Sequence, residues 1–156
     1  MGDPYRLRRF TLAQDEGETY QAAVSELRAG HKRTHWMWFI FPQISGLGQS
    51  SVSRTYAIGS LAEAAAYLAD PVLGDRLIEC ARILTELPGR TAQDVLGGTD
   101  AMKLRSSMTL FARAAPEEPL FQQVLDQYFG GRGDAATDRL LNAPESWPES
   151  SVAESE

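Results

Sequence analysis

The sequence predicts a mainly α-helical fold: a compact single-domain bundle of six or seven helices with at most one or two short strands. Two observations carry this prediction. Apolar residues recur at helical spacing along most of the chain. The segments that carry them end at glycine or proline steps such as Gly30, Pro71 and Gly97. There is no internal repeat and no alternation of strand and helix patterns, and the short connections favour antiparallel neighbours.

Length and composition indicate one globular domain. The chain has 156 residues, of which 43% are hydrophobic and 23% are charged, as is typical of a soluble globular protein. We expect the helical domain to span residues 1–142. Residues 143–156 are acidic and rich in Ser and Pro, which predicts a disordered tail. Trp147 within this tail is a candidate docking side chain or tether.

The charge pattern argues against non-specific binding to nucleic acid. The net charge is −6, but four of the acids lie in the tail, so the rest of the chain carries only −2, from 15 Lys and Arg against 17 Asp and Glu. A nucleic-acid binder of this type needs a basic face. A small cluster of Arg6, Arg8 and Arg9 still leaves room for one anionic ligand.

Cysteine usage and hydropathy predict a cytoplasmic protein without a membrane partner. The single cysteine, Cys80, lies in an apolar helical pattern and is interpreted as a small core residue. No apolar run approaches the ~20 residues that a bilayer span requires, and the N-terminus lacks the pattern of a signal peptide. The oligomeric state stays open.

In the first half of the chain, the helical pattern begins at Phe10 and runs to residue 28, after an N-terminal segment that we expect to be partly mobile. Gly17 divides it into a short helix over residues 12–16 and a longer one. Residues 36–41 are apolar all round, so their periodicity leaves helix and strand open. Whichever they form should end before Pro42, and residues 43–53 follow as a loop rich in Gly and Ser.

The second half is a succession of helices. Ser60 caps one that runs to residue 69 and ends at Asp70-Pro71, and the next keeps one face apolar from Leu73 to the break at residues 88–89. Thr91 caps a short turn over residues 92–96, and a further helix starts at Thr99 or Asp100. Two more cover residues 120–129 and 135–141.

Three groups of residues could carry chemistry. The first is the segment from Lys32 to Tyr56, in which aromatic rings able to stack a base sit beside hydrogen-bonding groups. Its candidate site residues are Lys32, His35, Trp38, Gln43, Gly48, Ser51 and Tyr56. A lysine and an imidazole suit phosphate binding or proton transfer. The alternative is that the aromatics are core and that His35 and Gln43 serve only the local structure.

The second group lies on the helix from Asp100 to Thr109. Cations are mixed there with small hydroxyl side chains that permit close approach of a ligand; the candidates are Asp100, Lys103, Arg105, Ser106 and Ser107. Alternatively, Asp100 and Lys103 form an ordinary surface pair.

The third group is the glycine-rich loop of residues 130–133, which delivers the carboxylate of Asp134 at a helix start. Asp134 is either a catalytic carboxylate or simply a helix cap. His31 and His35 are four residues apart, but no carboxylate or thiolate lies near them in the sequence. We therefore expect neither a metal site nor a cofactor.

Several segments of the chain are distinctive in combination, namely RFTLAQD, ELRAGHKRTHWMWFIFPQISGLGQS, YLADPVLGDRL, DAMKLRSSMTLF and FGGRGDAAT. Over residues 8–141 the chain resembles a bacterial family catalogued as domain of unknown function 1810. This resemblance implies a mostly helical structure and no established activity. The order of segments also bears a fainter similarity to the NADAR proteins, helical hydrolases that remove ADP-ribose from nucleobases. No catalytic glutamate is assigned here by motif; the acids nearest the expected site are Asp100 and Asp134.

These observations lead to two hypotheses. The first is a hydrolase that cleaves a glycosidic or phosphoester bond in a nucleotide-like or ADP-ribose-like ligand, a modified nucleobase included. Trp38 or Tyr56 would stack the ring, Gln43 would read its edge, and His35, Asp100 or Asp134 would transfer protons. Phosphates would be held by Lys32, Lys103 and Arg105. The second is a non-catalytic protein that binds a nucleotide or a peptide in the same pocket.

Overall fold

The computed structural model describes residues 2–142, and within this part of the chain the protein consists of helices and loops without a strand. This confirms the predicted mainly α fold. Helices of eight or more residues are α1 (Arg8–Asp15), α2 (Thr19–Ala29), α5 (Leu61–Ala69), α6 (Pro71–Thr85), α8 (Gly98–Ala114), α9 (Pro119–Phe129) and α10 (Ala135–Asn142). Shorter turns are η1 (Glu16–Glu18), α3 (Met37–Ile40), α4 (Ser51–Thr55) and α7 (Ala92–Leu96). The predicted tail with Trp147 lies outside the described residues.

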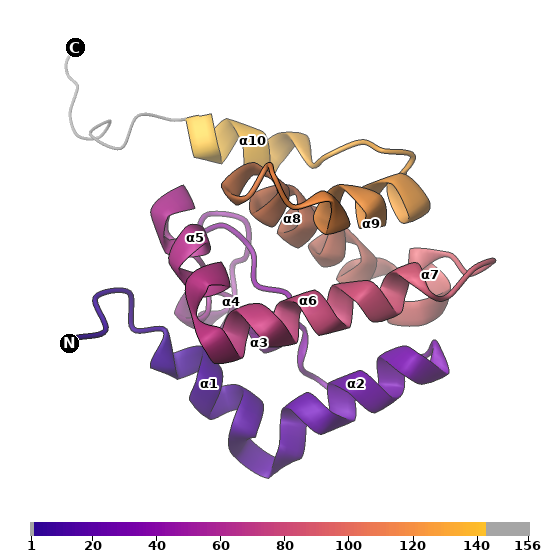
Figure 1. Ribbon diagram of the computed structural model, residues 1–156, viewed down its shortest axis with the longest axis horizontal. Coiled ribbons are helices and arrows are strands. Elements are labelled where there is room, and N and C mark those ends of the chain that lie inside the picture. The colour runs from indigo at the N-terminus through magenta and orange to yellow at the C-terminus, as the bar shows by residue number, and fades with distance from the viewer. Residues whose placement is uncertain (1, 143–156) are drawn as a thin grey trace.

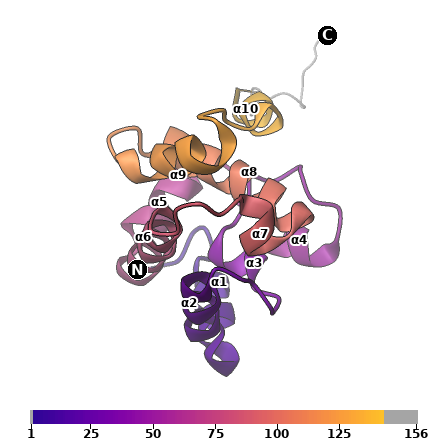
Figure 2. The same cartoon turned by 90° about the vertical axis from the view of Figure 1, so that its right-hand side faces the viewer.

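The longer helices are arranged in three tiers around one core (Figure 1). α1 and α2 form one outer tier, α5 and α6 cross the middle, and α8, α9 and α10 form the other outer tier. α8 is the central element, because it contacts α5, α7, α9 and α10. Figure 2 shows α3, α4 and α7 gathered on one side of the molecule, across from α5 and α6.

Capping residues set most helix boundaries where the sequence places them. The Ser60 side chain accepts a hydrogen bond from the backbone N–H of Glu63, and Asp70 caps α6 in the same way. Thr91 and Asp94 cap α7 reciprocally, each side chain accepting from the other's backbone N–H. These contacts satisfy N–H groups that a helix leaves unpaired at its start.

Two predicted helix starts are wrong by a few residues. The first helix begins at Arg8, not at residue 10 or 12, because the Asp3 carboxylate accepts hydrogen bonds from the backbone N–H groups of Leu7 and Arg8. The helix predicted from Thr99 or Asp100 begins one residue earlier. Gly97 (φ 86°) is its N-cap, and no side chain caps it.

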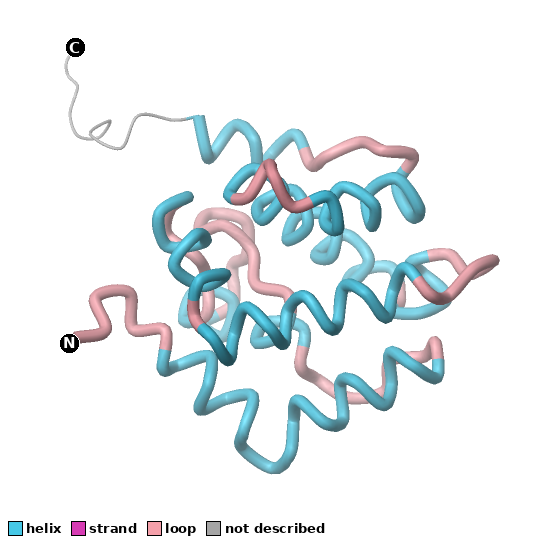
Figure 3. The backbone as a smooth tube through the Cα atoms, in the orientation of Figure 1, coloured by secondary structure: helices cyan, strands magenta, loops and turns pink. Residues whose placement is uncertain are grey.

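The apolar segment of residues 36–41 forms a single helical turn, α3, which settles the choice between helix and strand. Phe41 leaves the helix with φ −126°, as the residue before a proline should. Loop lies on both sides of α3 and of α4 (Figure 3). One isolated parallel bridge, between Ile44 and Ile58, is the structure's counterpart of the predicted short strands in the described range.

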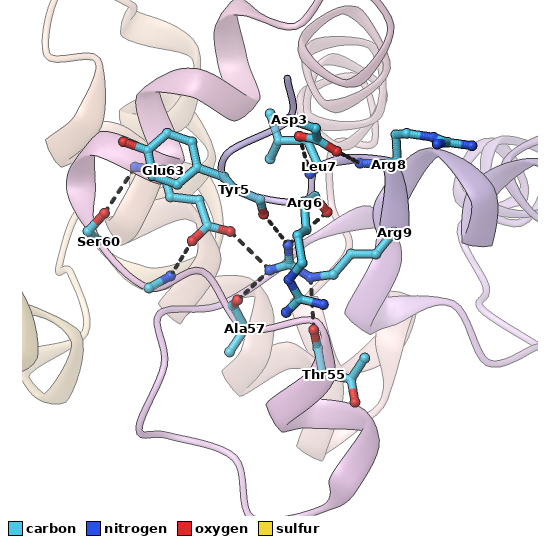
Figure 4. A network of polar contacts seen from close by, with 11 residues as sticks. Asp3, Tyr5, Arg6, Leu7, Arg8, Arg9, Thr55, Ala57, Ser60 and Glu63 are labelled. Atoms are coloured by element: carbon cyan, nitrogen blue, oxygen red, sulfur yellow. Dashed lines mark hydrogen bonds and ion pairs between the residues drawn. The ribbon is translucent and has the colours of Figure 1, made fainter. Parts of the chain in front are cut away.

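Arg9 ties the N-terminus to the middle of the chain (Figure 4). Its Nε donates to the carbonyl oxygen of Thr55 at 2.8 Å, and its Nη1 donates to two carbonyls at the start of the chain, 2.6 and 3.0 Å away. Its Nη2 donates to the carbonyl of Ala57 and to Oε2 of Glu63, at 2.8 and 2.9 Å. The guanidinium also lies over the Phe10 ring, 4.4 Å from its centroid. Arg9 thereby makes five hydrogen bonds, as many as its N–H donors.

Replacing Arg9 with lysine should therefore destabilise the fold. An ammonium has three donors and lacks the fork geometry, so backbone carbonyls of this partly buried network would lose their partners. We expect Arg9→Lys to lower the free energy of unfolding by about 2 kcal/mol in urea titration. The matched control is Arg8→Lys, since the exposed Arg8 side chain makes no hydrogen bond to the described part of the chain. Equal stability of the two variants would contradict this account.

Candidate functional site

One cleft lies between α3, α4, the loop that joins them and the first half of α8. It is lined by Met37, Trp38, Phe41, Gln43, Ile44, Ser45, Gly46, Gly48, Ser53, Arg54, Tyr56, Ala57 and Lys103. The empty space is about 390 Å³ with the open solvent at the mouth included, but the centres of water-sized molecules have only about 20 Å³ within it. This is room for one or two water molecules. Among the lining residues that the structure describes, the charged groups are both cationic, Lys103 and Arg54.

The loop wall of the cleft is positioned by backbone pairing at its base. The Ser45 N–H donates to the carbonyl of Ile58 at 2.7 Å, and the Ile58 N–H donates to the carbonyl of Gln43 at 2.8 Å. Further along, Ser50 caps α4 by accepting from the N–H of Ser53. Gly48 packs directly against the Ser53 side chain, so a larger residue would not fit there. The loop is thus fixed at both ends.

A cluster of two lysines, one carboxylate and two indoles stands beside the cleft. Asp100 is 2.9 Å from the ammonium of Lys32 and 3.7 Å from that of Lys103. Each ammonium also faces an indole: Lys32 lies 5.0 Å from the ring centroid of Trp36, and Lys103 lies 5.1 Å from that of Trp38. Lys32 is the more deeply held, with its side chain 8% exposed against 23% for Lys103. Lys103 is therefore the cation that this cluster presents to a ligand.

Two buried polar atoms near Lys103 have no hydrogen-bond partner in the described chain. They are Nε1 of Trp38, which lines the cleft, and Oγ of Ser107, one helical turn after Lys103. A buried donor without a partner costs roughly 1–3 kcal/mol, so such groups call for an explanation.

Asp134 belongs to a different cluster, which holds α10 against α8. Its Oδ2 accepts from the N–H and the hydroxyl of Thr137, at 2.9 and 2.5 Å, and from the hydroxyl of Ser106 at 3.2 Å. Its own N–H donates to Oγ1 of Thr109 at 2.8 Å. Arg105 donates to two carbonyls of the preceding loop. These contacts account for Asp134 as the N-cap of α10.

Glu26 organises the polar loop that precedes the cleft. Its Oε1 accepts from the backbone N–H groups of Arg33 and Thr34 and from Nε1 of Trp36, at 2.7, 3.0 and 2.8 Å. Its Oε2 accepts from the Thr34 hydroxyl at 2.7 Å. Burial raises the pKa of this carboxyl, but the hydrogen bonds outweigh it and lower the pKa to about 2. His35, at the end of the loop, is exposed.

Comparison with known proteins assigns the chain to a family. The sequence model of the family described as protein of unknown function, DUF1810, matches residues 4–141. The chain belongs to this family. The DUF1810 chain is also similar to a solved structure, the crystal structure of the conserved hypothetical protein Rv1873 from Mycobacterium tuberculosis. The two share 47% identity with a TM-score of 0.88, over 91% of this chain and 100% of that one. A search of curated proteins found no match.

The structure brings together some of the predicted site residues and separates others. Those that line the cleft are Trp38, Gln43, Gly48, Tyr56 and Lys103. Lys32 and Asp100 do not line the cleft. They are linked to it by Asp100, whose carboxylate contacts both Lys32 and the lining residue Lys103. The remaining predicted residues do not line it: His35 and Ser51 are exposed, Ser107 is buried, and Arg105, Ser106 and Asp134 form the cluster at α10.

Sequence reasoning did not single out Ser45 or Arg54 as part of the cleft, and it missed Glu26 and Arg9 as organisers of the surrounding structure. For Arg54 a local signal existed, because α4 is capped by Ser50 and its last turn carries the arginine towards the loop. For Glu26 and Arg9 there was none, since their partners come from tertiary contacts. No helix in the described part of this DUF1810 chain is long and apolar enough to cross a membrane.

The Glu26 contacts predict a specific dependence of stability on pH. Because the folded pKa is about 2 and the ordinary value is 4.5, the unfolded chain binds the proton more readily. The stabilisation by the carboxylate is complete above the ordinary value and is lost as the pH falls from about 4.5 towards 2. After allowance for solvent screening, we expect Glu26→Gln to cost about 1–2 kcal/mol at pH 7. Urea unfolding at several pH values should show the difference between variant and wild type shrinking below pH 4; a difference independent of pH would refute the assignment.

Proposed function

We propose that this DUF1810 protein binds a small anionic ligand with a planar ring, such as a nucleotide or an ADP-ribose-like compound, in the cleft. The observation that carries the proposal is the Lys103–Trp38 pair. It places a cation and an indole face in the cleft wall, and the N–H of the same indole is buried without a partner in the described chain. A ring stacked on the indole and an anionic oxygen near the ammonium would use the first two features, and an acceptor placed at Nε1 would use the third.

The other lining residues suit the same ligand. Gln43 offers an amide that can donate to and accept from the edge of a base, and Tyr56 offers a second aromatic side chain. Gly46 and Gly48 also line the cleft, although the space beside their Cα atoms is filled by the side chains of Leu140 and Ser53. Arg54 adds the second positive charge in place of Arg105, which is engaged with loop carbonyls. We further propose a cytoplasmic location, to which the single cysteine, with its buried thiol, is suited.

A thermal-shift screen against ADP-ribose, ADP, AMP and NAD tests the binding proposal. A ligand at 100 times its Kd should stabilise the protein by about 2.7 kcal/mol. Lys103→Met should weaken binding about tenfold through loss of the cation, and Trp38→Phe should weaken it several-fold through loss of the N–H. Arg82→Met, which removes an exposed cation from α6, is the charge-matched control. Binding that survives Lys103→Met unchanged, or a screen without any shift, would rule out this site.

Hydrolysis of a glycosidic or phosphoester bond is the second candidate function, and Asp100 is the observation that favours it. The lining residues in the described chain include no carboxylate, whereas Asp100 lies immediately behind Lys103. A water molecule held between the ligand and Asp100 could lose its proton to that carboxylate as it attacks the bond. His35 and Asp134, the other predicted proton-transfer groups, do not line the cleft. For this step the contact of Asp100 with Lys103 must loosen, because Asp100 itself does not line the cleft.

Single-turnover assays with ADP-ribose and with an ADP-ribosylated base separate the two functions. If the protein is a hydrolase, Asp100→Asn should lower the rate constant by roughly 100-fold or more while binding persists. Asp75→Asn, at an exposed acid on α6, is the control and should leave the rate unchanged. A wild-type protein that binds these compounds without product formation, followed by chromatography, would exclude hydrolysis and leave the binding proposal in place.

A further inference from the structure

The cleft is too narrow, as it stands, for the ligands proposed for it. The centres of water-sized molecules have only about 20 Å³ within it, whereas pockets for small molecules have about 300–1,000 Å³. One wall must therefore move for a ring to enter. The wall that moves is the one that is held least firmly.

The helical walls are anchored in the core. Met37 and Phe41, which α3 contributes, are almost completely buried and belong to the main hydrophobic cluster. Lys103 stands on α8, the helix that contacts α5, α7, α9 and α10. Moving either wall would expose core side chains, at a cost of roughly 1.5–3 kcal/mol for each large one.

The loop wall is held far more weakly. Residues 46–49 take part in no backbone–backbone hydrogen bond within the described chain. The pairing through Ser45 fixes the loop before this stretch, and the Ser50 cap fixes it afterwards. In between, the carbonyl of Gln49 accepts from Nη1 of Arg54. A segment with few backbone bonds between two fixed ends can open without disturbing the rest of the fold.

A side chain from the last helix covers this loop. Leu140 of α10 lies over Gly46, so closely that a Cβ at Gly46 would be 3.2 Å from Cδ2 of Leu140. Gly46 has φ +105°, a conformation that side-chain-bearing residues rarely adopt. Leu140 is still 38% exposed, so this contact is partial and can be released.

α10 is itself fastened to α8, at its start and in its middle. Arg113 on α8 pairs with Asp138 on α10, with Nε to Oδ1 at 2.9 Å and Nη2 to Oδ2 at 3.1 Å. The Asp134 cap adds contacts to Ser106 and Thr109 of α8. The position of Leu140 over the loop is therefore set by contacts that lie outside the cleft.

From these contacts we propose that residues 46–49 are a lid over the cleft and that Leu140 latches it. The lid opens when Leu140 leaves Gly46, and any partner or change that loosens α10 from α8 opens the cleft to ligand. This inference deepens the proposed function and rests on it for the identity of the ligand. The latch itself is a property of the ligand-free protein and is tested without ligand.

Backbone ¹⁵N relaxation of the full-length, ligand-free protein, read by NMR at single amides, tests the latch, because the amides of residues 46–49 make no backbone hydrogen bond within the described chain that hydrogen exchange could report on. Leu140→Ala should lower the order parameters of residues 46–49 to below about 0.6, the range of flexible backbone, and Asp138→Asn should lower them by loosening α10. Leu61→Ala removes a leucine of matching exposure (40%) from α5 and should leave these order parameters unchanged. Amides in α6 report on the rigid part of the fold and should keep order parameters of about 0.85 in all the variants.

The outcomes separate the latch from the proposed function. Unchanged order parameters of residues 46–49 in both Leu140→Ala and Asp138→Asn would overturn the latch, whatever ligand binds. Lower order parameters there with no response to ADP-ribose, ADP, AMP or NAD would support the latch and refute the nucleotide proposal. If ADP-ribose binds, Leu140→Ala should also raise its association rate constant several-fold in stopped-flow fluorescence, whereas an association rate equal to that of wild type would contradict a gating role.

Discussion

The five hydrogen bonds of Arg9 are the interaction on which the arrangement of the site depends. They join the start of the chain, the end of α4 and the first turn of α5 at one guanidinium. By fixing the carbonyls of Thr55 and Ala57, Arg9 also fixes Ile58, the residue that pairs with the base of the cleft loop. A side chain in the first helix thus sets one wall of a cleft whose lining comes from residues 37–103. Arginine suits this task because its donors are rigid and permanently charged.

The opposite side of the cleft is fixed by a second polar centre. Glu26 binds the loop after α2, and through Trp36 it sets where α3 begins. On this side of the cleft, two lysines share the carboxylate of Asp100 unequally. Asp100 holds Lys32 closely but Lys103 only at 3.7 Å, so one cation is committed to the fold and the other is left at the cleft. A single carboxylate thereby allows two lysines to lie together without leaving the site neutral.

Local chemistry is what the sequence could predict, because helix caps and stops act between residues close in the chain. Ser60, Thr91 and Asp134 were identified as caps for this reason, and the helices followed. The secondary structure of residues 36–41 could not be predicted, because an all-apolar run occurs in buried helices and in buried strands alike. Only some of the residues that line the cleft could be predicted from the sequence. Trp38, Gln43 and Tyr56 were grouped by proximity in sequence, whereas the separation of Asp134 from them depends on where α10 packs.

The firmly held walls of α3 and α8 and the weakly held lid have different roles in the proposed cleft. Opening the lid gives up the partial contact of Leu140 with Gly46 and few backbone hydrogen bonds, so its cost is small compared with that of disturbing α3 or α8. What the proposed ligand would gain comes from α3 and α8: a partner for the unpaired N–H of Trp38 and the positive charge of Lys103 for its anionic group. Since the gain and the cost arise in different parts of the structure, α10 can tune the rates of opening without changing the groups that recognise the ligand. A substitution of Leu140 should then act mainly on how fast a ligand binds and leaves. A substitution of the lining residues of α3 or α8 should act on how tightly and how selectively the ligand is held.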